Sequence, residues 1–264
     1  MTERQPQVLD LEKIIRTRAG SKSKYIPQFL INWFKKIAHE DFINGYLKEG
    51  YVGVDFCENC LKYLGVEIEV KGLENLPKDG RLYTFASNHP LGAIDGVTLG
   101  ALIGREYDGK VKYLMNDLLM NLKGMAPLGI PINKIGKQAR NLPRLIDEVF
   151  HSDNQMLVFP AGLCSRKIDG KIQDIAWSKA FVTKSRQTGR DIIPIYFDGE
   201  NSKRFYNIAS LQKKLGFKFN FAMLLLPDEM YRSTGRKYKI TFGKWQKPTL
   251  PRCSRRGTLF WVDR

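Results

Sequence analysis

The chain of 264 residues has only three histidines and four cysteines, and it has no long apolar run. The cysteines are irregularly spaced in a large chain, which argues against a disulfide framework and favours reduced, cytosolic thiols. Cys57 and Cys60 form a lone CxxC motif without a second pair or a nearby histidine. We therefore favour structural or unreactive thiols, with metal or redox chemistry as the alternative interpretation.

A membrane-spanning helix needs about 18–20 consecutive apolar residues, and no run in the sequence approaches that length. The longest candidate, FAMLLLP (221–227), is short enough to be a buried strand. The first residues, MTERQPQVLDLEK, carry acids and lack the apolar stretch of a signal peptide. We therefore expect a protein that does not span a membrane, although it could lie on one.

Acidic residues are scarce relative to basic ones, with 27 Asp and Glu against 43 Lys and Arg and a formal net charge of +16. This excess indicates an anionic partner, which could be nucleic acid, an anionic membrane surface or an acidic protein. We expect no nucleic-acid binding, because the sequence has no helix-turn-helix, zinc-finger or RNP-like motif.

Short apolar segments recur from about residue 65, in an order that alternates with helical patterns. The expected strands are VEIEV, RLYTFA, KVKYLM, QMLVFP, DIIPIYF, FAMLLLP and KYKITF, and the expected helices include 139–152 and 178–189. This alternation predicts an α/β domain with a mostly parallel central sheet flanked by helices. We divide the chain into an N-terminal helical segment (1–62), the α/β domain (63–245) and a basic tail without an assigned role (246–264).

The segment PQFLINWFKKIA (27–38) places five large apolar residues on one helical face, with two lysines beside it. These residues are Phe29, Leu30, Trp33, Phe34 and Ile37, flanked by Lys35 and Lys36. Two interpretations stay open. The face packs on the core, or it lies in a membrane interface with its aromatic rings among the lipid headgroups.

The decapeptide SNHPLGAIDG (87–96) places His89 and Asp95 in a loop that follows an expected strand. A helix that opens near Asp95 would let the carboxylate fold back to the imidazole of His89, fix its tautomer and favour its charged form. An imidazole held in this way can take a proton from an alcohol. The alternative is a loop histidine that is merely capped by a nearby acid.

Four segments in this order resemble the motifs of the glycerolipid acyltransferases of the lysophosphatidic-acid (PlsC-like) type. Asn88, His89 and Asp95 are similar to the first motif, with five residues between His89 and Asp95 where the family has four. GIPINKIGK (129–137) is similar to the second motif, and LVFPAGLCSRK (157–167) to the third. In the third, Ala161 and Cys164 replace the family's glutamate and arginine, while Arg166 and Lys167 follow closely. DIIPIYFDG (191–199) resembles the fourth.

The resemblance implies transfer of a fatty acyl group from an acyl carrier protein or coenzyme A thioester to a lipid hydroxyl, without a metal or a bound cofactor. His89 and Asp95 would be catalytic. The implied substrate-binding residues are Asn88, Asn133, Lys134, Lys137, Phe159, Pro160, Gly162, Ser165 and Arg166, and Arg140 is a further candidate for anion contact. An acceptor in the bilayer implies a peripheral protein on the cytoplasmic face of the inner membrane, docked through Phe29, Trp33, Phe34, Lys35 and Lys36.

The forms HPLGAIDG and FPAGLCSRK look most like a bacterial branch that acylates acyl-amino-acid lipids of the ornithine or glycine type. Some members of that branch are labelled hemolysins, but no long apolar segment or G-x-S-x-G nucleophile supports haemolysis here. Two alternatives stay open: lysophosphatidic acid as the acceptor, and a non-catalytic lipid-binding protein on the same fold.

Overall fold

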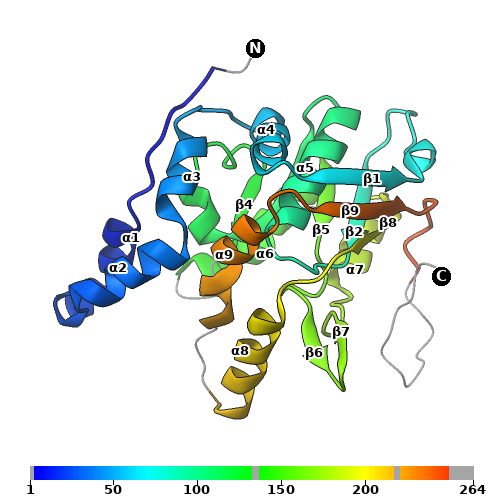
Figure 1. Cartoon of the computed structure of the whole chain (residues 1–264). Coiled ribbons are helices and arrows are strands. Elements are labelled where there is room, and N and C mark those ends of the chain that lie inside the picture. The colour runs from blue at the N-terminus through cyan, green and yellow to red at the C-terminus, as the bar shows by residue number, and fades with distance from the viewer. Residues whose placement is uncertain (1–2, 133–136, 217–220, 250–264) are drawn as a thin grey trace.

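The computed structural model describes residues 3–132, 137–216 and 221–249, which form a layered α/β fold (Figure 1). Its main sheet has the strand order β1-β9-β8-β2-β5-β3-β4. The strands are β1 (Glu67–Lys71), β2 (Tyr83–Ser87), β3 (Val111–Asn116), β4 (Gly129–Ile132), β5 (Gln155–Val158), β8 (Asp191–Asp198) and β9 (Lys237–Phe242). Every described pairing in this sheet is parallel except β8 with β9. The predicted fold class, α/β with a mostly parallel sheet, is confirmed.

Helices cover both faces of the sheet, because its central strands are apolar on both sides. Tyr83 and Phe85 of β2 belong to a core cluster shared with α4 (Val54–Leu64) and α5 (Ile94–Glu106). Ala86, the next residue, belongs to a second cluster with α6 (Lys137–Phe150) and α7 (Ala180–Gln187). The alternation of side chains along one strand therefore fixes which helices lie on which face.

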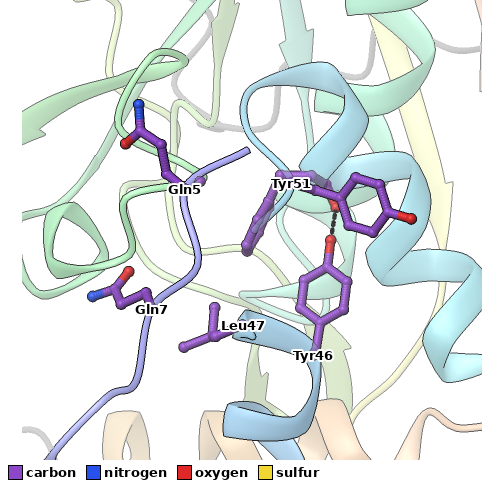
Figure 2. Close-up of a pocket in the computed structure, with 7 residues that line it drawn as sticks. Gln5, Gln7, Tyr46, Leu47 and Tyr51 are labelled. Carbon is purple, nitrogen blue, oxygen red and sulfur yellow. Dashed lines mark hydrogen bonds between the residues drawn. The ribbon is translucent and has the colours of Figure 1, made fainter. Parts of the chain in front are cut away.

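The N-terminal region contains α1 (Leu11–Ala19), the 3-10 helix Gly20–Tyr25, α2 (Gln28–Ile37) and α3 (Glu40–Leu47). α3 shares the first core cluster through Tyr46 and Leu47, so it packs with the α/β layers. The residues before α1 lie beside the C-terminal end of α3. The backbone N–H of Gln7 donates to Leu47 O at 3.1 Å, and that of Gln5 donates to Gly50 O, just after α3, at 2.7 Å. Figure 2 shows the shallow pocket between them, where the Tyr46 hydroxyl donates to the carbonyl of Phe56.

A third apolar cluster joins α2 to the region that follows β8. Phe205 and Tyr206 of α8 (Lys203–Lys214) pack there with Cys164 and with the partly buried Ile37 of α2. Beside it, His39 Nε2 lies 2.9 Å from Asp228 Oδ1 of α9 (Leu226–Arg232). The N-terminal helices are therefore connected to the loops at the carboxyl ends of the strands.

The expectation of a strand at FAMLLLP is wrong. Residues Phe221–Leu225 form a 3-10 helix, and α9 begins at Leu226. Pro227 is tolerated in the first turn of a helix, and the acids Asp228 and Glu229 face the positive helix end. The short antiparallel hairpin of β6 (Arg166–Ile168) and β7 (Lys171–Gln173) was not expected either.

Only the start of the expected C-terminal tail is described. Gln246 exchanges two backbone hydrogen bonds with Ile192 in β8, at 2.8 and 2.9 Å, while residues 250–264 lie outside the described residues. Within the described ranges, none of the helices is long and apolar enough to cross a membrane.

Arg190, which directly precedes β8, is buried and donates to four carbonyls. Its partners are Phe150, Asn154, Ser152 and Tyr83, and burial lowers its pKa to about 10. We predict that Arg190→Met lowers the free energy of unfolding by about 3 kcal/mol, because buried carbonyls lose their donors. Urea denaturation followed by circular dichroism measures this change.

The matched control is Arg186→Met on the exposed face of α7, which should change stability by less than about 0.5 kcal/mol. Equal unfolding midpoints for the two variants would contradict the role given to Arg190.

Candidate active site

His89 lies two residues after β2, in the loop that leads to α5 (Figure 1). β2 is central in the sheet and runs parallel to β5 and β8 on its two sides. The loop therefore lies at the carboxyl ends of the strands, where parallel α/β sheets place their binding sites.

The imidazole of His89 and the carboxylate of Asp95 form a hydrogen-bonded pair, with 3.0 Å between Nδ1 and Oδ2. The side chain of Asp95 is fully buried and that of His89 is 17% exposed. The same carboxylate accepts from the backbone N–H groups of Leu91, Gly92 and Gly96 at 2.9–3.1 Å. The sequence prediction that Asp95 folds back to His89 is met by this geometry.

The extra residue between His89 and Asp95 is accommodated by Gly92, which has a positive φ of 81°. A Cβ at this position would lie 3.0 Å from Leu226 Cδ2 and 3.1 Å from Cys164 Cβ, so glycine is needed for both the turn and the space. The loop absorbs the insertion without separating the pair.

His89 is held on several sides by segments outside its own loop. The ring stacks on Phe159, with 4.1 Å between centroids, and the backbone carbonyl accepts from Ser165 N–H at 2.8 Å. The backbone N–H of His89 points to the carboxylate of Asp174, 3.2 Å from Oδ2. When Nδ1 carries the proton that it donates to Asp95, Nε2 is the free acceptor of the ring.

Burial disfavours the charged imidazolium, but the adjacent Asp95 carboxylate outweighs burial, and the pKa of His89 lies above its usual value. Burial likewise opposes ionisation of Asp95, yet His89 and the loop N–H groups hold the pKa of this carboxyl below its usual value. The pair can therefore accept a proton at His89 while Asp95 stays ionised.

Two of the predicted substrate-binding side chains bond to the protein itself. The amide oxygen of Asn88 accepts from Phe197 N–H at 2.7 Å, and its amide nitrogen donates to Phe197 O at 2.9 Å. Ser165 is buried and donates its hydroxyl to Asp174 Oδ1 at 2.6 Å. These contacts position the loops, because the first motif is tied to β8 and the third to the segment after β7.

Among the other predicted residues of the third motif, Phe159 contacts His89 directly. Phe159 stacks on its ring, Pro160 O accepts from Ser178 N–H at 3.0 Å, and Gly162 adopts a positive φ of 67° on an exposed turn. Arg166 donates from Nη1 to Cys164 O at 2.6 Å and lies over the ring of Phe205. Its positive charge opposes protonation of His89.

The second motif is described only in part. Asn133 and Lys134 lie outside the described residues. The backbone of Lys137 and Arg140 forms the start of α6, but their side chains are not among the described parts. Their expected contacts with substrate stay predictions.

The expected docking face on α2 is divided between core and solvent. Ile37 packs on the third apolar cluster, whereas Phe29, Leu30 and Trp33 are 69%, 45% and 59% exposed. Lys35 is paired with Glu40 at 2.9 Å, while Lys36 is exposed and Phe34 is half-buried. α1 and α2 project from one side of the molecule (Figure 1).

Asp174 is a site residue that the sequence analysis missed. Besides His89 and Ser165, it accepts from the indole N–H of Trp177 at 2.9 Å. It lies after the β6–β7 hairpin and outside the four motifs. Only the short unexpected hairpin, which turns the chain back toward the third motif, brings it to His89.

The CENC cysteines lie in the core on α4, away from this loop. Both thiols are free and buried, and burial raises the pKa of Cys60 to about 12 and that of Cys57 as well. Thiols that stay protonated at neutral pH are poor nucleophiles and poor metal ligands.

Comparison with known proteins identifies the class. The sequence model of a family described as acyltransferase matches residues 13–254. The lyso-glycine lipid O-acyltransferase of Bacteroides thetaiotaomicron is 54% identical over 251 residues, which cover 93% of this chain and 92% of that protein. The protein of the same name from Phocaeicola vulgatus is 52% identical, covering 93% and 90%. The chain belongs to the acyltransferase family and is an acyltransferase, as the motifs predicted.

A solved structure is also similar, with a TM-score of 0.45 and 16% identity over 89% of this chain and 76% of that chain. It is the 1-acyl-sn-glycerophosphate (LPA) acyltransferase PlsC from Thermotoga maritima.

We predict that His89→Gln lowers kcat on the order of 10²–10⁴-fold, because a general base contributes that much. In the wild type, kcat/KM should fall as the pH drops below the raised pKa of His89, since only the neutral imidazole accepts a proton. Asp95→Asn removes the negative charge that raises this pKa, so the acid limb should move to lower pH. Initial rates between pH 5 and 9 measure both effects.

His151→Gln is the matched control, because His151 is exposed at the end of α6. Full activity in His89→Gln, with the melting temperature unchanged, would contradict the assignment of the base.

Proposed function

We propose that this enzyme transfers a fatty acyl group from a thioester carrier to the hydroxyl of a single-chain acyl-glycine lipid. The observation that carries the proposal is the buried Asp95 bonded to a partly exposed His89 in a chain of the acyltransferase family. The names of the two bacterial relatives, lyso-glycine lipid O-acyltransferases, support the choice of acceptor.

The reaction follows from the chemistry of the pair. His89 Nε2 takes the proton of the acceptor hydroxyl while Asp95 stabilises the imidazolium that forms. The hydroxyl oxygen attacks the thioester carbonyl and forms the new C–O bond. The C–S bond then breaks, and the leaving thiolate takes the proton from His89, which regenerates the neutral base. No acyl-enzyme is required.

Arg166 is the candidate for the acceptor's head group. A glycine that is acylated on its amine keeps a free carboxylate, and a guanidinium can bind a carboxylate through two parallel hydrogen bonds. Cys164 occupies the position at which the family has its motif arginine, and Arg166 lies two residues after it. Its Nη1 donates to the backbone carbonyls of Cys164 and Ser165, which holds the guanidinium within the third motif.

The acceptor has one acyl chain and resides in a bilayer, so the enzyme must reach a membrane surface. The exposed rings of Phe29 and Trp33, with Lys36 beside them, suit a docking face for anionic lipid. The net charge of +16 suits the same surface and an acidic carrier or coenzyme A. We place the enzyme on the cytoplasmic face of the inner membrane, with acyl carrier protein or coenzyme A as the donor's carrier.

We predict that the purified enzyme acylates a single-chain acyl-glycine lipid at least about tenfold faster than lysophosphatidic acid, because one guanidinium balances the single charge of a carboxylate but leaves the second charge of a phosphate dianion uncompensated. Mass spectrometry of the products, with acyl carrier protein and coenzyme A thioesters in parallel, measures the rates.

Arg166→Ala should raise KM for the glycine lipid. Preference for lysophosphatidic acid would overturn the acceptor, and tight lipid binding without turnover would favour a non-catalytic lipid-binding protein.

We also predict that the double variant Phe29→Ser, Trp33→Ser binds vesicles of phosphatidylglycerol and phosphatidylethanolamine at least about fivefold more weakly than the wild type. The reason is that each aromatic ring gains binding energy when it moves from water into the lipid interface. Co-sedimentation measures the bound fraction. Leu73→Ser, an exposed leucine in the 3-10 helix Leu73–Asn75, is the control. Equal binding by the variant and the wild type would exclude α2 as the docking face.

A further inference from the structure

We propose that Asp174 is a positioning residue for acyl transfer, which holds the main chain of His89 and the hydroxyl of Ser165 in one hydrogen-bonded unit. One carboxylate accepts from three donors: His89 N–H at 3.2 Å, Ser165 Oγ at 2.6 Å and Trp177 Nε1 at 2.9 Å. The proposal rests on the acyl-transfer chemistry proposed above and adds a residue to it.

The contacts of Asp174 complete a two-sided attachment of the His89 backbone. The N–H of His89 donates to Asp174, and its carbonyl accepts from Ser165 N–H at 2.8 Å. Asp174 and Ser165 are themselves bonded, so both backbone groups of His89 are held by one unit. Hydrogen bonds to an ionised acceptor are stronger than neutral ones, which makes this unit stiff.

The position of His89 decides whether Nε2 meets the acceptor oxygen. Asp95 orients the ring through Nδ1, but it lies only six residues away, in the first turn of α5, and does not connect the loop to the third motif. Asp174 supplies this attachment from 85 residues further along the chain. A displacement of about 1 Å at a reacting atom can cost on the order of a hundredfold in rate.

Asp174 also acts on His89 through its charge. The charged groups that act on the imidazole are the carboxylates of Asp95 and Asp174 and the guanidinium of Arg166, which also bonds to the neighbouring Cys164. Both carboxylates favour the imidazolium and Arg166 disfavours it. Removal of the Asp174 charge should therefore lower the pKa of His89.

The test is Asp174→Asn, which keeps the size of the side chain and removes its charge. We expect kcat to fall on the order of tenfold to a hundredfold, with less than about a threefold change in KM for the acceptor. The acid limb of kcat/KM should move to lower pH. A residue with only a structural role would lower the rate without moving this limb.

The matched control is Asp169→Asn, an exposed aspartate in the turn of the same hairpin. Its positive φ of 49° suits asparagine equally well, so activity and pH profile should stay at wild-type values. Trp177→Phe removes one hydrogen-bond donor to Asp174 but leaves the charge of Asp174 in place. We therefore expect a smaller loss of kcat than in Asp174→Asn, and the acid limb of kcat/KM should stay at the wild-type pH.

A readout without substrate separates this proposal from the proposed function. NMR titration of the three histidines should show a lower pKa for His89 in Asp174→Asn than in the wild type, and no change for His151. An unchanged pKa of His89, together with kcat within twofold of the wild type, would overturn the role of Asp174. Failure of the wild type to acylate any acceptor would overturn the proposed function instead.

Discussion

The buried carboxylate of Asp95 is the constraint on which the rest of the site depends. A buried charge is costly unless it is paired and hydrogen-bonded, and Asp95 meets this condition with His89 and three nearby backbone N–H groups. Those donors converge only when the chain turns tightly at Gly92 and α5 begins at Ile94. The cost of burying the acid thus selects one loop conformation, and this conformation carries the imidazole at the edge of the sheet.

The local parts of this arrangement were predictable from sequence. Apolar runs marked most strands, and the spacing of His89 and Asp95 after an expected strand placed the pair correctly. Sequence patterns did not predict the structure correctly where contacts between distant segments determine it. FAMLLLP is as apolar as a strand, yet Pro227 and the acids after it start a helix. Asp174 carries no motif, and only the pairing of β6 with β7 reveals its contact with His89.

Some motif residues make hydrogen bonds within the protein itself. Asn88 and Ser165 match the family pattern, but their side chains bond to Phe197 and Asp174. A sequence motif can therefore include residues that hold loops together. Arg166, in contrast, does not match the family pattern, yet its positive charge acts on the imidazole of His89.

The attachment of His89 to Asp174 has a consequence for biosynthesis. His89 and Asp95 are six residues apart, whereas Asp174 is 85 residues from His89. A chain emerging from the ribosome therefore exposes both members of the pair well before the residue that fixes them has been translated. Contacts of such long separation form late in folding, because loop closure precedes them. The nascent chain would remain unable to acylate lipid until the second half of the sheet had assembled.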